Sequence, residues 1–123
     1  MNKDLIAIKI IAEAEYSSIV LYSFILDYKL RIILMDKSFI DVNVSNKLKN
    51  KFGFHWETKN KLNEIYRYDN FPDINWRHLK SFPYHFHFQE QNNVIEPTFP
   101  KDLLNGFRGF MDFVKNLIQA ETK

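Results

Sequence analysis

Between Ile19 and Phe88 the chain consists of short runs rich in β-branched and aromatic residues, and this feature constrains the fold more than any other. Polar and apolar residues alternate within several runs, as expected for strands of a sheet with one wet face. Asp, Asn, Ser and Lys residues between the runs predict tight turns, including one at 58–61. The predicted strands are 19–26, 29–35, 39–44, 52–57, 62–68 and 84–88. They predict an antiparallel meander of about five or six strands.

A helix is predicted on each side of this meander. In residues 3–14 the Ala and Glu content favours a helix, and its apolar face is Leu5, Ile8, Ile11 and Ala12. A second helix is predicted to start at Thr98, which we expect to be its N-cap. Its apolar stripe consists of Leu103, Phe107, Phe110, Met111, Val114, Leu117 and Ile118. Such a stripe predicts packing against a core.

These elements predict a single α+β domain over residues 1–123. The N-terminal helix and the C-terminal amphipathic helix should pack on one face of the sheet. Gly106 and Gly109 in the second helix are expected to permit close packing against that sheet.

The composition excludes several kinds of site. The chain has no cysteine, which removes disulfides, thiol nucleophiles and Cys-based zinc sites. Neither a signal peptide nor a membrane-spanning run is predicted, so we expect a cytoplasmic protein. The formal net charge is only +2, but residues 47–80 hold eight Lys and Arg residues against four acidic ones, a local charge of +4. Charge that is concentrated in this way favours an anionic partner for this part of the chain.

All four histidines, His55, His78, His85 and His87, fall within 33 positions of this same region. His85 and His87 are two residues apart on a predicted strand, so their side chains should lie on one face. Histidine can act as a general acid or base or bind metal, but a strand histidine is often only structural. A metal site that includes Asp69 is the weaker interpretation, because no diagnostic ligand spacing is present. We therefore expect no metal and no cofactor.

Aromatic residues alternate with lysines and arginines along residues 51–88. Aromatic rings can stack on unpaired bases while cations contact phosphates, which favours RNA or single-stranded nucleic acid as the partner. In each strand one face must serve the core, so at most about half of these aromatics are available. Histidines on such a surface could cleave RNA without metal.

The order of three motifs resembles the TumE family of toxin components of toxin–antitoxin systems. The motifs are Phe52–Trp56, Tyr66–Pro72 and Ser81–His87, and Glu96–Thr98 before the last helix resembles the family's ending. Tyr68 stands where the family usually has Trp, and Tyr84 takes the place of one of two paired histidines. The resemblance implies a toxin with an antitoxin partner, usually a small helix-turn-helix protein.

These observations together predict a toxin that acts on RNA, with histidine acid–base chemistry as the candidate mechanism. The predicted catalytic residues are His55, Arg67, Asp69, His85 and His87. The predicted nucleic-acid-binding residues are Lys51, Trp56, Asn70, Arg77, His78, Lys80 and Tyr84. Two alternatives stay open: a non-catalytic module that binds single strands, and a protein-interaction domain with structural histidines, which could form a homodimer through the Phe-rich helix.

Overall fold

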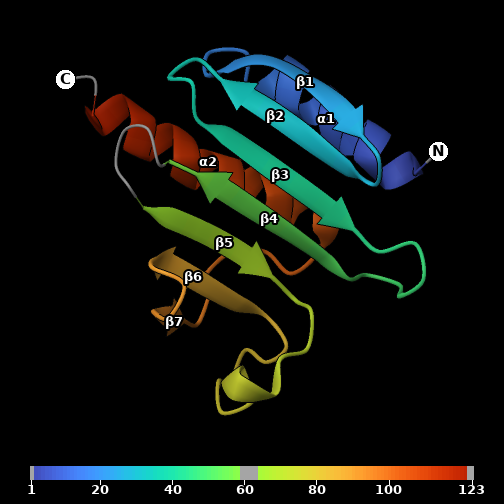
Figure 1. Cartoon of the computed structure of the whole chain (residues 1–123), viewed down its shortest axis with the longest axis vertical. Coiled ribbons are helices and arrows are strands. Elements are labelled where there is room, and N and C mark those ends of the chain that lie inside the picture. Colours follow the sequence, from blue (N-terminus) through green and yellow to red (C-terminus); the bar gives the residue numbers. More distant parts are fainter. Residues whose placement is uncertain (1, 59–63, 122–123) are drawn as a thin grey trace.

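The computed structural model describes residues 2–58 and 64–121 and has two long helices and one sheet (Figure 1). The helices are α1 (Lys3–Glu15) and α2 (Leu103–Glu121), and a short 3-10 helix, η1, covers Ile74–Trp76. The strands are β1 (Val20–Leu26), β2 (Lys29–Leu34), β3 (Phe39–Val44), β4 (Phe52–Glu57), β5 (Ile65–Asp69), β6 (His85–Gln89) and β7 (Val94–Ile95). None of the helices in these two described ranges is long and apolar enough to cross a membrane.

The strands form one antiparallel sheet in chain order, from β1 to β7. This confirms the predicted α+β meander, and the described sheet has seven strands instead of five or six. The additional strand is β7, whose two residues pair with Phe86 and His87 in a stretch that was predicted as loop. Two residues are too few to show alternation, so the sequence pattern could not reveal this strand. The first residues of the predicted strand 62–68 and most of the turn at 58–61 lie outside the described residues.

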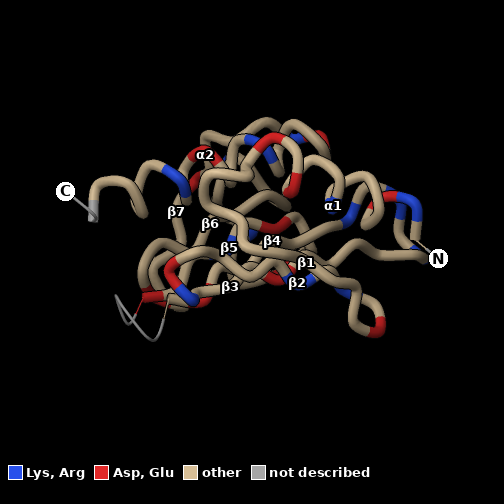
Figure 2. Tube along the Cα trace, turned by 90° about the horizontal axis from the view of Figure 1, so that it is seen from above, with Lys and Arg blue, Asp and Glu red and all other residues tan. Residues whose placement is uncertain are grey.

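Both long helices cover the same face of the sheet, as predicted (Figure 2). The predicted apolar face of α1 is the face that is buried in the core. Asn2 begins this helix because its side-chain oxygen accepts hydrogen bonds from the backbone N–H groups of Asp4 and Leu5. The helix packs against β1, β2 and β3, while α2 packs against β4.

The start of α2 differs from the prediction. The helix begins at Leu103. The Asp102 carboxylate caps it by accepting a hydrogen bond from the backbone N–H of Asn105 at 3.0 Å. The predicted N-cap, Thr98, is wrong by about one helical turn. The segment before the helix folds back on it, and a Cβ at Gly106 would lie 2.7 Å from the Pro100 oxygen. Gly106 therefore permits close packing against this segment, and the same Cβ position would also lie 3.6 Å from the Tyr68 ring of the sheet, the side on which close packing was predicted.

The Phe-rich face of α2 is part of the chain's own core. Phe107, Phe110 and Met111 are fully buried, and Val114 is as well. The rings of Phe107 and Phe110 lie 5.5 and 5.7 Å from the ring of Phe54 in β4. This face is consequently not available for the dimer that was considered from the sequence.

Candidate functional site

The register of β5 and β6 places four polar side chains next to one another on the face of the sheet opposite the helices. Arg67 is paired with His87, and Asp69 is paired with His85. Residues directly opposite in an antiparallel pair have their Cβ atoms about 4.5–5.5 Å apart. The intervening residues Tyr66, Tyr68 and Phe86 point the other way and are buried in the core. The period of two along each strand thus separates the site from the core.

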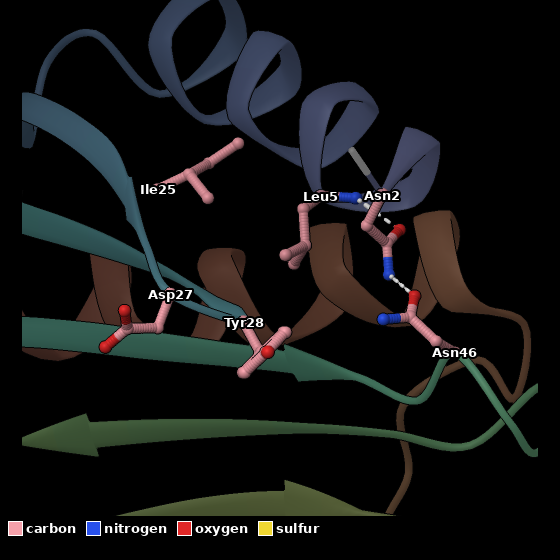
Figure 3. Close-up of a pocket in the computed structure, with 6 residues that line it drawn as sticks. All are labelled: Asn2, Leu5, Ile25, Asp27, Tyr28 and Asn46. Atoms are coloured by element: carbon pink, nitrogen blue, oxygen red, sulfur yellow. Dashed lines mark hydrogen bonds between the residues drawn. The ribbon is translucent and has the colours of Figure 1, made fainter.

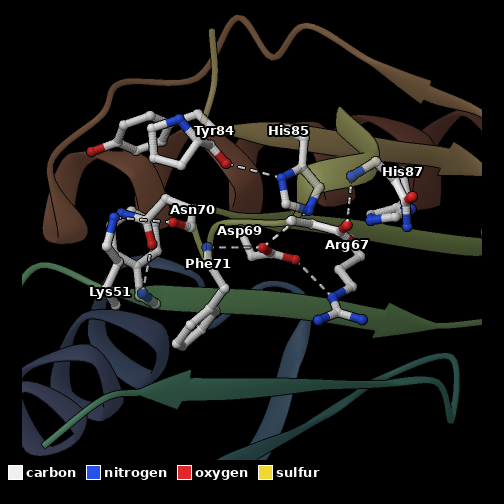
Figure 4. Close-up of polar contacts among 12 residues, drawn as sticks. Lys51, Arg67, Asp69, Asn70, Phe71, Tyr84, His85 and His87 are labelled. Carbon is white, nitrogen blue, oxygen red and sulfur yellow. Dashed lines mark hydrogen bonds and ion pairs between the residues drawn. The ribbon is translucent and has the colours of Figure 1, made fainter. Parts of the chain in front are cut away.

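Asp69 contacts two of the other three residues of this group, Arg67 and His85. We call the group the polar centre (Arg67, Asp69, His85 and His87; Figure 4). Its side chain is only 1% exposed. The Oδ1 atom accepts a hydrogen bond from the backbone N–H of Phe71 at 3.1 Å and lies 3.1 Å from Nε2 of His85. The Oδ2 atom lies 2.8 Å from Nε of Arg67, but this ion pair lacks the alignment of a hydrogen bond.

The two histidines of the polar centre are held by backbone carbonyl groups. Nδ1 of His85 lies 2.9 Å from the Pro83 oxygen, and Nδ1 of His87 lies 2.7 Å from the Gln91 oxygen. A carbonyl oxygen only accepts, so we assign the proton to Nδ1 in both rings. The ring centroids are 5.1 Å apart. Each histidine therefore has its Nε2 atom available for contacts with the other residues of the polar centre or with a ligand.

The surroundings shift the pKa values of these two histidines in opposite directions. Burial lowers the pKa of His85, but the hydrogen bond and negative charge of Asp69 outweigh it, so the pKa is raised. Burial lowers the pKa of His87, and the positive charges of His85 and Arg67 lower it further, against the opposing effect of its bond to Gln91. Two neighbouring titratable groups with divergent pKa values are a typical arrangement for an acid and a base.

The polar centre forms one wall of a cavity of about 520 Å³, within the range of small-ligand sites. The segment between β5 and β6 forms the other walls, through Phe71, Pro72, Asp73 and Ile74. The Trp76 ring stands edge-on to His87, with centroids 6.1 Å apart. This segment explains why His85 and His87 are only 3% and 2% exposed on a face that neither α1 nor α2 covers.

A second cavity, of about 540 Å³, lies at the start of α1 (Figure 3). Its lining residues are Asn2, Leu5, Ile25, Asp27, Tyr28 and Asn46. Among the described residues, neither a histidine nor a cationic side chain lines it. The Asn2 amide donates to Asn46 Oδ1 at 2.8 Å, a contact that joins the helix start to the loop after β3. The two cavities are similar in size, but the lining of this one has fewer side chains that could act as an acid, a base or a phosphate ligand.

His55, the fifth predicted catalytic residue, lies on the correct face but outside the cavity. It is paired with Arg67 on β5, which itself is paired with His87 on β6, so two strand spacings of about 4.8 Å separate the two histidines. Its Nε2 lies 3.7 Å from Glu57 Oε2. Burial lowers its pKa, against the charge of Glu57. The structure therefore places His55 beside Arg67 but away from the two histidines of the polar centre and outside the cavity lining.

Two of the predicted nucleic-acid-binding residues have structural contacts instead. Trp56 is 1% exposed on the helix side, where its ring stacks on Tyr66 and its Nε1 donates to Ser38 Oγ at 2.9 Å. Asn70 is also 1% exposed, and its Oδ1 accepts from the backbone N–H of Phe52. A buried ring cannot stack on a base, and the Asn70 side chain is occupied by backbone contacts, so neither side chain is available to nucleic acid in this structure.

The remaining predicted binding residues lie at the rim or on the covering segment. Arg77, His78 and Lys80 are exposed and follow η1 directly. Lys51 donates to the Asn70 carbonyl oxygen at 3.3 Å, and the Tyr84 ring lies under Lys101 Nζ at 5.5 Å. The exposed basic residues Arg77 and Lys80 thus lie on the segment that continues from the cavity-lining residues Asp73 and Ile74.

Two features of the site are not among the residues predicted from the sequence. One is the pair of backbone carbonyls, at Pro83 and Gln91, that fix the histidines. The other is Gly53, which is paired with Asp69 and whose Cβ, if present, would lie 3.1 Å from Asp69 Cβ. A glycine inside a strand is a recognised sign of close approach by a neighbour, so this signal was readable.

Comparison with known proteins gives one match. The family model described as Toxin TumE matches residues 7–118. The chain belongs to the TumE toxin family. The match runs from α1 to α2 and includes the whole polar centre, so the site lies within the TumE portion of the chain. Neither curated proteins nor solved structures yield a match.

Proposed function

We propose that this TumE-family toxin acts on RNA and cleaves it at the polar centre. The observation that supports this is the meeting of two histidines, held through Nδ1, with an arginine and a carboxylate in the wall of one cavity. Phosphodiester cleavage next to a ribose needs a base, an acid and a cation for the phosphate. The four residues supply these groups from two neighbouring strands.

In the proposed reaction His87 is the base and His85 is the acid. Nε2 of His87 takes the proton of the ribose 2′-OH, and the 2′-oxygen attacks the adjacent phosphorus. The bond from phosphorus to the 5′-oxygen of the next nucleotide breaks, and that oxygen takes the Nε2 proton that His85 shares with Asp69. The products are a 2′,3′-cyclic phosphate and a free 5′-hydroxyl.

Arg67 and Asp69 assist this reaction in different ways. The guanidinium of Arg67 is 39% exposed and has N–H groups beyond its contact with Asp69, so it can bind the phosphate oxygens as negative charge develops. Asp69 is a positioning residue, because it orients His85 and favours its protonated form. Arg77, His78 and Lys80 would attract the RNA backbone to the rim of the cavity.

The test is cleavage of end-labelled RNA by the purified full chain, with and without EDTA. We expect cutting in EDTA with 2′,3′-cyclic phosphate ends, and a loss of roughly 100-fold or more in His87→Ala and Asp69→Asn. Asp41→Asn is the matched control, since Asp41 also contacts an arginine on this face but lies on β3. Absence of cutting, or equal loss in the control at a temperature where it is folded, would refute the mechanism.

Binding without cutting would leave the non-catalytic alternative. A salt-sensitive complex that forms equally well with His87→Ala would identify a single-strand-binding toxin, because phosphate contacts release counterions and histidine chemistry is not needed. If the chain neither binds nor cuts RNA, the result favours the protein-interaction alternative.

We also propose an antitoxin partner of the small helix-turn-helix type, on the basis of the toxin family. Expression of the chain alone should arrest growth of a bacterial host, and co-expression of a neighbouring gene of that type should restore it. An antitoxin of another type, or none, would refute this part.

A further inference from the structure

We propose that Asp69, His85 and His87 form a binding site for a divalent transition-metal ion, with Zn²⁺ as the reference ion, and that metal bound there inhibits the toxin. The binding stands independently of the proposed function, while the inhibition rests on it. The ligand spacing in the sequence is not diagnostic, so no metal is predicted from the sequence alone.

The three side chains are already close enough to share an ion. One candidate ligand atom from each lies within 4.8 Å of the other two. A tetrahedral zinc ion, with bonds of about 2.0–2.2 Å, needs its ligand atoms roughly 3.3 Å apart. Nε2 of His85 and Oδ1 of Asp69 are 3.1 Å apart, so this pair needs almost no adjustment.

The histidine contacts are those that a metal site requires. Histidine ligands usually donate the proton of the other ring nitrogen to a carboxylate or backbone carbonyl, which fixes the ring and the tautomer. Here both Nδ1 atoms contact carbonyl oxygens, of Pro83 for one ring and Gln91 for the other. Both Nε2 atoms are thereby the ones available to a metal ion.

Asp69 provides an independent indication. Its Oδ2 is buried and, among the described residues, has no aligned hydrogen-bond donor. A buried carboxylate oxygen without such a donor calls for another partner. The Arg67 guanidinium approaches it, but the arginine side chain is 39% exposed and can turn outward. An ion held by both oxygens of this carboxylate, with Oδ1 beside His85 Nε2, would give Oδ2 the partner that the unaligned arginine contact does not supply.

Two histidines and one carboxylate leave a coordination position open toward the cavity. Such N/O donor sets suit zinc and its neighbours in the transition series, whereas Mg²⁺ prefers an octahedron of oxygens. An ion bound to both Nε2 atoms would occupy the lone pair that His87 needs as a base and displace the proton that His85 donates. Cleavage would therefore stop while the metal stays bound.

Zinc binding can be measured without RNA. Full-length, tag-free protein stripped with EDTA is titrated with Zn²⁺ by calorimetry, and in parallel with Mg²⁺. We expect one equivalent of Zn²⁺ at micromolar or lower Kd, no binding of Mg²⁺, and at least tenfold weaker zinc binding in His87→Ala and Asp69→Asn. Asp41→Asn and His78→Ala are the controls and should bind as the unaltered chain does.

Arg67→Gln gives a sharper test. Its removal takes a positive charge away from the proposed ligand, so this variant should bind Zn²⁺ more tightly, by several-fold. A merely exposed histidine that captures metal would not respond in this way. Absorption of the Co²⁺ complex of the unaltered chain, which should show the bands of a four- or five-coordinate N/O site, tests the site even where a variant fails to fold.

The outcomes separate the two proposals. No stoichiometric zinc binding, or unchanged binding in His87→Ala, overturns the metal site whether or not RNA is cut. Zinc binding in a protein that cuts no RNA refutes the ribonuclease and leaves the metal site. Cleavage that persists at saturating Zn²⁺ overturns the inhibition.

Discussion

The two faces of the sheet are built from alternating residues of the same strands and have opposite properties. The face under the helices is aromatic and dry, with Phe54, Trp56, Tyr66 and Tyr68 at most 1% exposed. The opposite face carries a row that crosses the strands as Arg31, Asp41, His55, Arg67 and His87. The core and the candidate site therefore lie on different faces, and each family motif contributes residues to both.

The open face is itself not uniform. At β2 and β3 its ion pairs stay partly exposed, with Arg31 28% and Asp41 13% exposed. At β5 and β6 the segment 70–84 covers the face, and Asp69 falls to 1%. Low exposure strengthens electrostatic interactions, because water no longer screens them. The polar centre therefore differs from an ordinary charged surface because the segment 70–84 covers it, whereas the rest of this face is open.

The largest expected effect comes from neighbouring residues of β4 that belong to different faces. Phe54→Ala should lower the free energy of unfolding by about 3–5 kcal/mol, since it removes a fully buried ring. His55→Ala, one residue along, should lower it by less than about 1 kcal/mol, because the side chain is 37% exposed. Chemical denaturation of both variants measures this. Similar losses would contradict the division between the faces.

A smaller effect is expected from Asp41→Asn on the exposed part of the open face. Burial raises the Asp41 pKa, but hydrogen bonds from Arg31 and Lys29 outweigh it and hold the pKa below its ordinary value of 3.8. The folded state thus binds this proton less readily than the unfolded state, so the carboxylate stabilises the fold above that value. The loss at pH 7 should be roughly 1–2 kcal/mol, since the pair is partly exposed.

The same reasoning fixes the pH dependence of this variant. The stabilisation by Asp41 is lost as the pH falls through the folded-state pKa, so the difference between the two proteins should be constant near neutrality and shrink in acid. Denaturation at a series of pH values measures it. A difference that grows in acid would show that Asp41 is not held as an ion by its two cations.

The smallest effect on stability is expected from Gly53→Ala, beside the covered end of the face. The new Cβ would crowd Asp69, which three contacts hold in place, while alanine recovers about 0.5–1 kcal/mol of backbone entropy. Stability should change by less than about 1 kcal/mol, whereas RNA cleavage should fall roughly tenfold through displacement of Asp69. Parallel melting and cleavage measurements test this, and full activity would show that Asp69 tolerates the shift.

The sequence by itself determined the periodic features of this protein. Alternation of period two and helical spacing predicted six strands, both helices, the buried face of α1, and the common face of His85 and His87, because such patterns are local. The ordered motifs around Arg67 and Asp69 also predicted the family, which the match to Toxin TumE confirms.

Only the tertiary structure decided which residues meet. Strand register placed Arg67 and Asp69 opposite His87 and His85 and left His55 beside Arg67, two strands from the other histidines. Register depends on turns and packing that no single run contains. The path of residues 70–84 and the carbonyl contacts of the two histidines are likewise set by the folded backbone. Local patterns determine the faces, whereas the site is formed by long-range contacts, which is why the sequence alone could predict its residues but not its geometry.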